Sequence, residues 1–225
     1  MKKSPVAHKI AKDVFTIPNL ISVTGAALAI RGSEKIDTAE GLTECAVGRL
    51  ADVLDGKVAR MTGQTSNFGA ALDATTDKIV MAKILYEMNK KELAPKYVLG
   101  TVAVLNSINA VATGIANLRS DEKAETRPTK SGKLAMAGET VTLISYIAAH
   151  ITEQDKNPKL AKLLRKLGAV AFATSLPLAT HATYTYVKRA VNGNTEKPEE
   201  SRQITDVNRS LGSMAMLSRL SGRSQ

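Results

Sequence analysis

Four long stretches that are almost free of charged residues constrain the fold of this chain more than any other feature. They cover residues 14–30, 97–118, 134–151 and 167–187, and Glu139 is the only charged residue in them. An α-helix needs about 20 mostly apolar residues to cross a bilayer, and two stretches reach this length while the others fall slightly short. The stretches therefore predict membrane-spanning helices. The mean hydropathy of −0.09 is low for an integral membrane protein, so buried helices of a soluble protein are the alternative.

Two further helices are predicted between these stretches, over residues 36–56 and 72–89. Both carry charged side chains at helical spacing, so their polar faces must look into an aqueous cavity or into water. No convincing window of the sequence shows the alternation of apolar and polar residues that is typical of a strand. The expected fold is therefore all-α, a six-helix polytopic membrane bundle with a polar cavity at the cytoplasmic side.

The length and the two ends of the chain predict one domain with short appendages. The 225 residues are close to the size of a single domain. Residues 1–16 are basic and lack the features of a signal peptide, residues 17–191 form the helical domain, and residues 192–225 begin with a polar linker. Apolar residues recur at helical spacing over residues 206–220, which predicts an amphipathic tail helix that lies on an anionic membrane or packs on the domain.

The charge balance favours an anionic partner. Lys and Arg number 31 against 21 Asp and Glu, a net charge of +10, which suits phosphorylated substrates, an acidic lipid surface or nucleic acid. Aromatic residues make up only 4% and Trp is absent, so a base-stacking platform is not expected and nucleic acid is not a predicted partner. The single cysteine, Cys45, cannot form an internal disulfide and is expected to be a small buried hydrophobe.

Four aspartates carry the chemistry that the sequence predicts. Asp52 and Asp55 are three residues apart, and Asp73 and Asp77 are four residues apart, so each pair lies on one face of its helix. Residues 61–67 include Gly, Thr, Ser and Asn and predict the connection between the two helices. An antiparallel hairpin then brings the four carboxylates together.

Four converging carboxylates require a cation. Two like charges about 4 Å apart repel by roughly 4 kcal/mol at an effective dielectric constant near 20. Oxygen ligands without a neighbouring Cys or His indicate a hard divalent ion, Mg²⁺ or Mn²⁺. Four carboxylates can hold two such ions, and paired ions suit phosphoryl transfer. The alternative is a solvated acidic face that is paired with Lys57, Arg60 and Lys78.

The spacing of these residues resembles the signature of the CDP-alcohol phosphatidyltransferase family. The residues that match its eight fixed positions are Asp52, Asp55, Gly56, Ala59, Arg60, Gly69, Asp73 and Asp77. Agreement at eight positions with fixed intervals is far more specific than a lone glycine-rich motif. Residues 17–22 resemble the opening of the family's first helix and residues 131–134 the start of its fifth, so the resemblance covers roughly residues 17–191.

The resemblance implies a six-helix membrane enzyme that transfers a phosphatidyl group from CDP-diacylglycerol to an acceptor hydroxyl and releases CMP. By position, it implies metal ligands at Asp52, Asp55, Asp73 and Asp77, with Asp77 also the catalytic general base. The positions that match its contacts to the CDP-linked lipid are Gly56, Arg60, Ser66 and, in the first helix, Asn19 and Ser22. The resemblance also implies a homodimer, and the active site is expected to face the cytoplasm.

A basic cluster predicts that the acceptor carries a phosphate. The cluster comprises Arg119, Lys123, Arg127, Lys130 and Lys133, and its last three members, which precede the uncharged stretch at 134–151, are the predicted contacts to the acceptor phosphate. Glycerol 3-phosphate and inositol phosphate both fit such a cluster. Residues 77–78 and 131–133 resemble phosphatidylglycerophosphate synthases, which favours glycerol 3-phosphate. Inositol phosphate and serine are the alternative acceptors.

Two other classes of protein compete with this interpretation. A basic helical protein that binds nucleic acid or lipid without chemistry predicts strong salt dependence and no need for a divalent ion. The absence of a DNA-binding motif counts against it. A soluble metal-dependent pyrophosphate hydrolase could use the same carboxylates, but only a lipid enzyme should require detergent.

Overall fold

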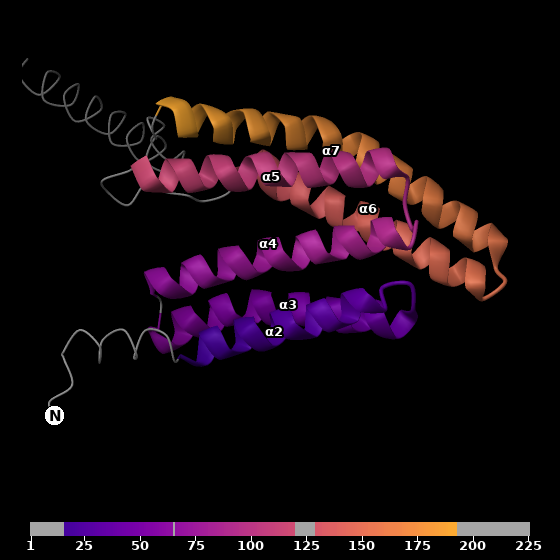
Figure 1. The fold of residues 1–225 in the computed structure, drawn as a ribbon, viewed down its shortest axis with the longest axis horizontal. Helices are drawn as coiled ribbons and strands as arrows, with labels where there is room; N and C mark the ends of the chain where they lie inside the picture. Colours follow the sequence, from indigo (N-terminus) through magenta and orange to yellow (C-terminus); the bar gives the residue numbers. More distant parts are fainter. Residues whose placement is uncertain (1–15, 65, 120–128, 193–225) are drawn as a thin grey trace, which may run out of the picture.

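The fold is described by a computed structural model for residues 16–64, 66–119 and 129–192. Within these ranges the chain forms six α-helices and no strand (Figure 1). The helices are α2 (Ile17–Glu34), α3 (Ala39–Thr62), α4 (Asn67–Lys90), α5 (Lys96–Arg119), α6 (Lys130–Gln154) and α7 (Pro158–Asn192). The predicted all-α class is confirmed for this part of the chain. The basic segment up to residue 15, Arg127 and the predicted tail helix at 206–220 lie outside the described residues.

Side-chain caps set where four of the helices begin. Thr16, Thr38, Ser66 and Thr129 each accept a hydrogen bond from the backbone N–H three residues further on, which satisfies a group that the first turn leaves unpaired. Helix α3 ends at Gly63, whose φ of 64° is a left-handed conformation that glycine adopts without strain.

The hairpin between α3 and α4 is shorter than the sequence predicted. The expected helix over 36–56 instead begins at Ala39 and continues to Thr62, and the helix expected from residue 72 begins at Asn67. The connection is thus residues 63–66 rather than 61–67. The reason is local. Gly63 ends α3 in a left-handed conformation and the Ser66 side chain caps the first turn of α4, so both helices extend into the polar stretch that was expected to be the connection.

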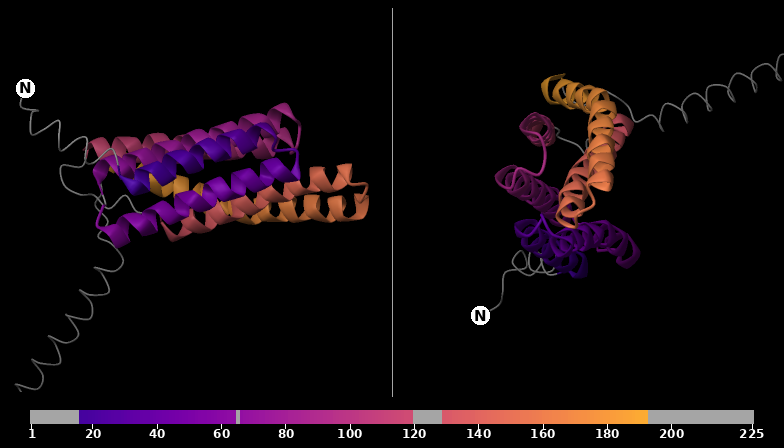
Figure 2. Two further views of the ribbon diagram at one scale, coloured as in Figure 1. Left: turned by 90° about the horizontal axis from the view of Figure 1, so that it is seen from below. Right: turned by 90° about the vertical axis from the view of Figure 1, so that its right-hand side faces the viewer.

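Successive helices run in alternating directions, so the bundle has two distinct ends (Figure 1). The α2–α3, α4–α5 and α6–α7 turns lie at one end. The α3–α4 turn, the last turn of α5 and the first turn of α6 lie at the other. Viewed along the long axis of the bundle, α2 and α3 form one side and α5 and α7 the opposite side. Helices α4 and α6 lie between them (Figure 2).

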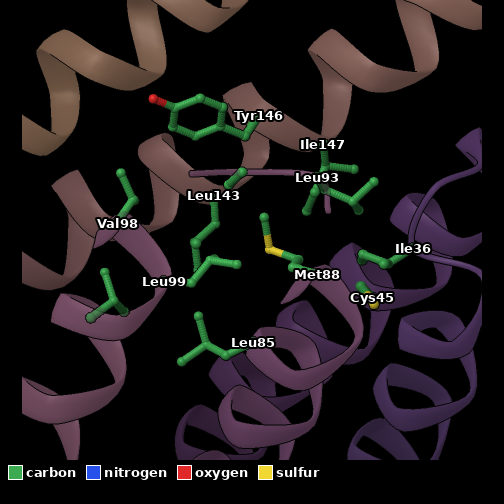
Figure 3. Packing of buried hydrophobic residues seen from close by; sticks show 12 residues of the cluster. Ile36, Cys45, Leu85, Met88, Leu93, Val98, Leu99, Leu143, Tyr146 and Ile147 are labelled. Carbon is green, nitrogen blue, oxygen red and sulfur yellow. The ribbon is translucent and has the colours of Figure 1, made fainter. Parts of the chain in front are cut away.

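The apolar core is concentrated toward the end that holds the α2–α3 and α4–α5 turns. Met88 is fully buried there, and side chains from α3 to α6 and from the two turns surround it (Figure 3). Cys45 is 5% exposed within this cluster, which confirms the expectation of a small buried hydrophobe. Lys91 donates a 2.5 Å hydrogen bond to Asp37 at the same end and holds the pKa of that carboxyl below its ordinary value. The core therefore holds most of the helices together at the end of the bundle that carries no predicted site residue.

Helices α2 and α3 approach closely because both carry glycine at their crossing. A Cβ atom placed on Gly48 would lie 2.5 Å from the backbone oxygen of Gly25, and one placed on Gly25 would lie 2.8 Å from the Ala51 Cβ atom. Small residues permit this kind of backbone contact between helices, which is a common way to pack them in lipid. The contact fixes α3, and with it the aspartates that α3 carries.

Among the residues that the structure describes, two helices are long and apolar enough to cross a bilayer, at Lys96–Ala116 in α5 and Lys130–Gln154 in α6. Large apolar side chains are also exposed on other helices, among them Leu20, Leu163 and Val170. Exposed apolar surface on this scale favours a lipid environment. The six-span topology and the cytoplasmic position of a polar cavity stay predictions.

Replacing Gly48 with alanine is expected to destabilise the bundle. The added methyl group meets the Gly25 carbonyl oxygen, and forced overpacking of this kind costs about 1–3 kcal/mol. The matched control is Gly100→Ala in α5, where nothing lies within 4 Å of the added atom and alanine favours a helix by up to about 1 kcal/mol over glycine. Thermal unfolding in detergent should show a lower midpoint for Gly48→Ala only. Equal midpoints in the two variants would contradict the close crossing.

Candidate metal and nucleotide site

Three of the four signature aspartates converge at the α3–α4 hairpin. Asp52 and Asp55 lie in the second half of α3, and Asp73 lies in the first half of α4. One carboxylate oxygen from each lies within 4.8 Å of the other two. Asp55 is only 4% exposed, so little water screens the repulsion between these groups. The hairpin predicted from the sequence thus brings these three side chains together.

The fourth aspartate, Asp77, pairs with a residue for which the sequence analysis assigned no role. Arg49 of α3 donates a hydrogen bond from Nη1 to Asp77 Oδ1, and the same nitrogen lies 3.9 Å from Asp52 Oδ2. The guanidinium therefore bridges carboxylates of both helices and offsets part of their repulsion. The sequence could have indicated that Arg49 lies near the aspartates, because it precedes Asp52 by three residues and so lies on the same face of α3.

Helix α2 adds hydroxyl and amide groups to the acidic cluster. The Ser22 hydroxyl donates a hydrogen bond to Asp55 Oδ2, and both residues are buried. Asn19, one turn earlier, is 6% exposed. A Cβ atom placed on Gly69 would lie 2.9 Å from Asn19 Oδ1 and 3.2 Å from Ser66 Oγ. The predicted nucleotide contacts Asn19, Ser22 and Ser66 therefore come together around Asp55 and the first turn of α4.

The remaining predicted contacts lie toward the same end of the bundle. Gly56 follows Asp55 directly, and Arg60 Nη1 is the nearest neighbouring atom to a Cβ placed there, at 3.7 Å. Arg60 is exposed, so its charge can reach a phosphate beside the acidic cluster. Lys130 and Lys133 are exposed in the first turn of α6 (Figure 1). The structure places them at this end, and Arg127 lies outside the described residues.

A cavity of about 620 Å³ lies between α4, α5, α6 and α7. Asp77 and Lys78 form part of its wall, and the other wall positions are divided between alanine or glycine and larger or polar residues such as Thr75, Glu139 and Tyr186. Asp77 thus contacts Arg49 and also borders an open space. A ligand in that space would lie against this carboxylate.

The donor set fits a hard divalent cation. Three carboxylate oxygens from two helices can approach one ion, and the cluster contains no Cys or His that would favour a softer metal. Mg²⁺ bound by so few protein ligands keeps positions for water and for substrate phosphates. The arrangement can therefore hold an ion against a pyrophosphate, with Arg60 as a further cation.

Comparison with known proteins agrees with this arrangement. The sequence profile of the CDP-alcohol phosphatidyltransferase family matches residues 10–181. The chain therefore belongs to this family, whose members are membrane-associated, divalent-metal-dependent enzymes that transfer phosphatidyl groups from a CDP-alcohol.

Two relatives of the chain are named for the synthesis of different lipids. A probable cardiolipin synthase (CMP-forming) of Drosophila melanogaster is 29% identical over 99 residues, which cover 40% of this chain and 30% of that protein. The archaetidylinositol phosphate synthase of Pyrococcus horikoshii is 51% identical over 41 residues, which cover 18% of this chain and 22% of that protein. Each match thus spans less than a third of the curated relative.

The chain also matches a solved structure. The phosphatidylinositol phosphate synthase of Mycobacterium tuberculosis, with CDP-DAG bound, has a TM-score of 0.43 and 17% sequence identity, and the match covers 86% of this chain and 96% of that chain.

Replacing Asp55 with asparagine is expected to weaken binding of Mn²⁺ at least tenfold. The change removes one charged ligand but keeps an oxygen that can accept the hydrogen bond from Ser22. Asp155→Asn is the matched control, because Asp155 is an exposed residue at the end of α6 and far from the hairpin. Titration calorimetry on purified protein in detergent measures both. Unchanged Mn²⁺ affinity in Asp55→Asn would argue against this metal site.

Replacing Arg49 with glutamine is expected to make the fold more dependent on metal. Without the guanidinium, the aspartates lose their internal cation, and the stability in EDTA should fall by about 1 kcal/mol or more. Added Mn²⁺ should then raise the unfolding midpoint of Arg49→Gln further than that of the wild type. The control is Arg165→Gln, which breaks the exposed pair with Glu153 at the opposite end. Equal Mn²⁺ increments in all three proteins would count against this role for Arg49.

Proposed function

We propose that this protein is a membrane enzyme of phospholipid biosynthesis that transfers the phosphatidyl group of CDP-diacylglycerol to the hydroxyl of a small acceptor. CMP is the other product. The observation that carries the proposal is the convergence of Asp52, Asp55 and Asp73 at the family signature, with Asp77 beside them on a cavity wall.

The acidic cluster supports a role in binding metal and pyrophosphate. Asp52, Asp55 and Asp73 would hold Mg²⁺ or Mn²⁺, and the second ion predicted from the sequence would require Asp77 as well. When bound, the ion neutralises the pyrophosphate and lowers the pKa of an acceptor hydroxyl. Asn19, Ser22, Ser66, Gly56 and Arg60 would contact the CDP moiety, which is supported by the position of Asn19 and Ser66 beside Gly69 and by the hydrogen bond from Ser22 to Asp55.

Asp77 is proposed as the general base. Its carboxylate takes the proton of the acceptor hydroxyl, and the acceptor oxygen attacks the phosphorus that carries the diacylglycerol. A new phosphodiester bond forms as the bond to the CMP phosphate breaks. Arg49 orients the Asp77 carboxylate through its hydrogen bond, while the cavity on the other side admits the acceptor.

The acceptor is proposed to be a small alcohol that carries a phosphate. Lys130 and Lys133 stand at the same end as the acidic cluster, where they would attract such a group. The sequence favours glycerol 3-phosphate, while one relative is named an archaetidylinositol phosphate synthase. The enzyme is further proposed to hold its active site toward the cytoplasm, where the water-soluble acceptor would be available, and to form a homodimer.

Replacing Asp77 with asparagine is expected to reduce CMP release from CDP-diacylglycerol at least about 100-fold, because asparagine cannot take up the proton. The measurement is Mg²⁺-dependent CMP release in mixed detergent and lipid micelles, with glycerol 3-phosphate, inositol phosphate, serine and phosphatidylglycerol as acceptors. Asp155→Asn is again the control and should retain wild-type activity. An Asp77→Asn variant with wild-type rates would remove the assigned base.

The same assay separates the rival functions. CMP release that needs neither acceptor nor detergent would indicate a pyrophosphate hydrolase. A folded protein that binds anionic lipid but releases no CMP with any acceptor would indicate a binding protein. Either result would overturn the proposed transferase.

A further inference from the structure

The hairpin of α6 and α7 carries positive charge that the proposed chemistry does not use. Its basic residues are all exposed, and they are Lys156, Lys159, Lys162, Arg165 and Lys166. Arg165 pairs with Glu153 of α6, and the other acidic residue of this turn is Asp155. Among the described residues the four lysines have no ion-pair partner. The tip of the hairpin, at the end opposite to the acidic cluster, therefore has an excess of positive charge.

Large apolar side chains lie beside these lysines on the first turns of α7. Their exposed fractions are 42%, 61% and 49% for Leu160, Leu163 and Leu167. Lys159 precedes Leu163 by four residues and Lys166 follows it by three, so both lysines flank this leucine on one face of the helix. Exposed leucines next to lysines are typical of a helix at a membrane surface, where apolar side chains enter the acyl boundary and ammonium groups reach the headgroups.

Packing against α6 sets the depth of this face. A Cβ atom placed on Gly168 would lie 3.1 Å from the Tyr146 ring, so these two residues are level in the antiparallel pair. Leu163 lies about 7.5 Å from Gly168 along the helix axis, which makes it level with the last turns of the candidate span Lys130–Gln154. Lys159 lies about 6 Å further out. Leu163 is thus at the edge of the hydrocarbon layer, and Lys159 is in the headgroup layer.

The same face is left uncovered by the rest of the bundle. The α6–α7 turn extends past the α2–α3 and α4–α5 turns at this end (Figure 1, Figure 2). The described helices therefore offer no partner for the exposed leucines here, and the exposed fraction of Leu163 reflects this. A partner that suits the face must bring apolar surface and negative charge together, which is the chemistry of an anionic phospholipid.

We propose that this face of α7 binds anionic phospholipids in the leaflet at the end of the bundle opposite to the acidic cluster. Leu163 and Leu167 contact the acyl chains, while Lys159 and Lys166 contact the headgroup phosphates. A zwitterionic headgroup has the same phosphate but balances it with an ammonium group, so the lysines favour a lipid with net negative charge. The binding surface contains no residue of the proposed active site, so it does not depend on the catalytic assignment.

A tryptophan in place of Leu163 reports on the lipid beside it, because the sequence contains no other Trp. Full-length Leu163→Trp is placed in nanodiscs of phosphatidylcholine and phosphatidylglycerol, and one of the two lipids carries bromine on its acyl chains to quench the fluorescence. Brominated phosphatidylglycerol should quench more than brominated phosphatidylcholine at the same mole fraction, with a local preference of at least about fivefold. High salt should reduce this preference, since the attraction is electrostatic.

Paired variants in the Leu163→Trp protein separate this face from the overall charge of the chain. Lys159→Gln with Lys166→Gln should abolish the preference for phosphatidylglycerol. Lys57→Gln with Lys133→Gln removes the same charge from exposed positions at the opposite end and should leave the preference unchanged. If the first pair does not fold, Lys162→Glu alone should lower the preference severalfold.

A second reporter position tests whether the preference is local. Val104 is 56% exposed in the uncharged part of α5, and a Val104→Trp protein should be quenched equally by the two brominated lipids.

Four outcomes would overturn the inference. Equal quenching by the two lipids at Leu163→Trp would show no selection for negative charge. A preference that persists without Lys159 and Lys166, or that is lost equally in the Lys57 and Lys133 pair, would not come from this face. An equal preference at Val104→Trp would reflect the net charge of the whole chain. Quenching by neither lipid would show that protein covers the face. Each of these results leaves the proposed transferase intact, because CMP release tests that function separately.

Discussion

The carboxylates of Asp52, Asp55 and Asp73 meet within 4.8 Å, and the surrounding structure has to hold them there against their mutual repulsion. Arg49 supplies a positive charge between the helices, and Ser22 donates a hydrogen bond to the most buried of the three carboxylates. These two contacts come from different helices, so the position of α2 on α3 matters as much as the hairpin. The close crossing at Gly25 and Gly48 provides that position.

The apolar core and the acidic cluster lie toward opposite ends of the bundle. The apolar core around Met88 lies near one end, where turns join successive helices (Figure 3). The acidic cluster and the exposed lysines of α6 lie toward the other end (Figure 1). A site built on the ends of helices that are anchored elsewhere can stay open to substrates and still keep its geometry.

Asp77 connects the two parts of the proposed site. On one side it accepts a hydrogen bond from Arg49, and on the other it borders the cavity that Glu139 and Asn109 line. The acidic cluster and the cavity are therefore adjacent regions rather than one pocket. Under the proposed function, this arrangement would hold the nucleotide-linked lipid and the acceptor alcohol on opposite sides of Asp77, the proposed base.

Local features of this chain could be derived from the sequence because they depend on neighbours within one or two turns. Helical periodicity alone placed Asp52 with Asp55 and Asp73 with Asp77, and the spacing of the signature identified the family. The end of α3 and the start of α4 differ by several residues from the predicted positions, because Gly63 and the Ser66 cap determine them. The pairs Arg49–Asp77 and Asn106–Glu139 join residues 28 and 33 positions apart on different helices. Only tertiary packing decides such pairs, because periodicity shows which face of a helix is polar but not which other helix that face will meet.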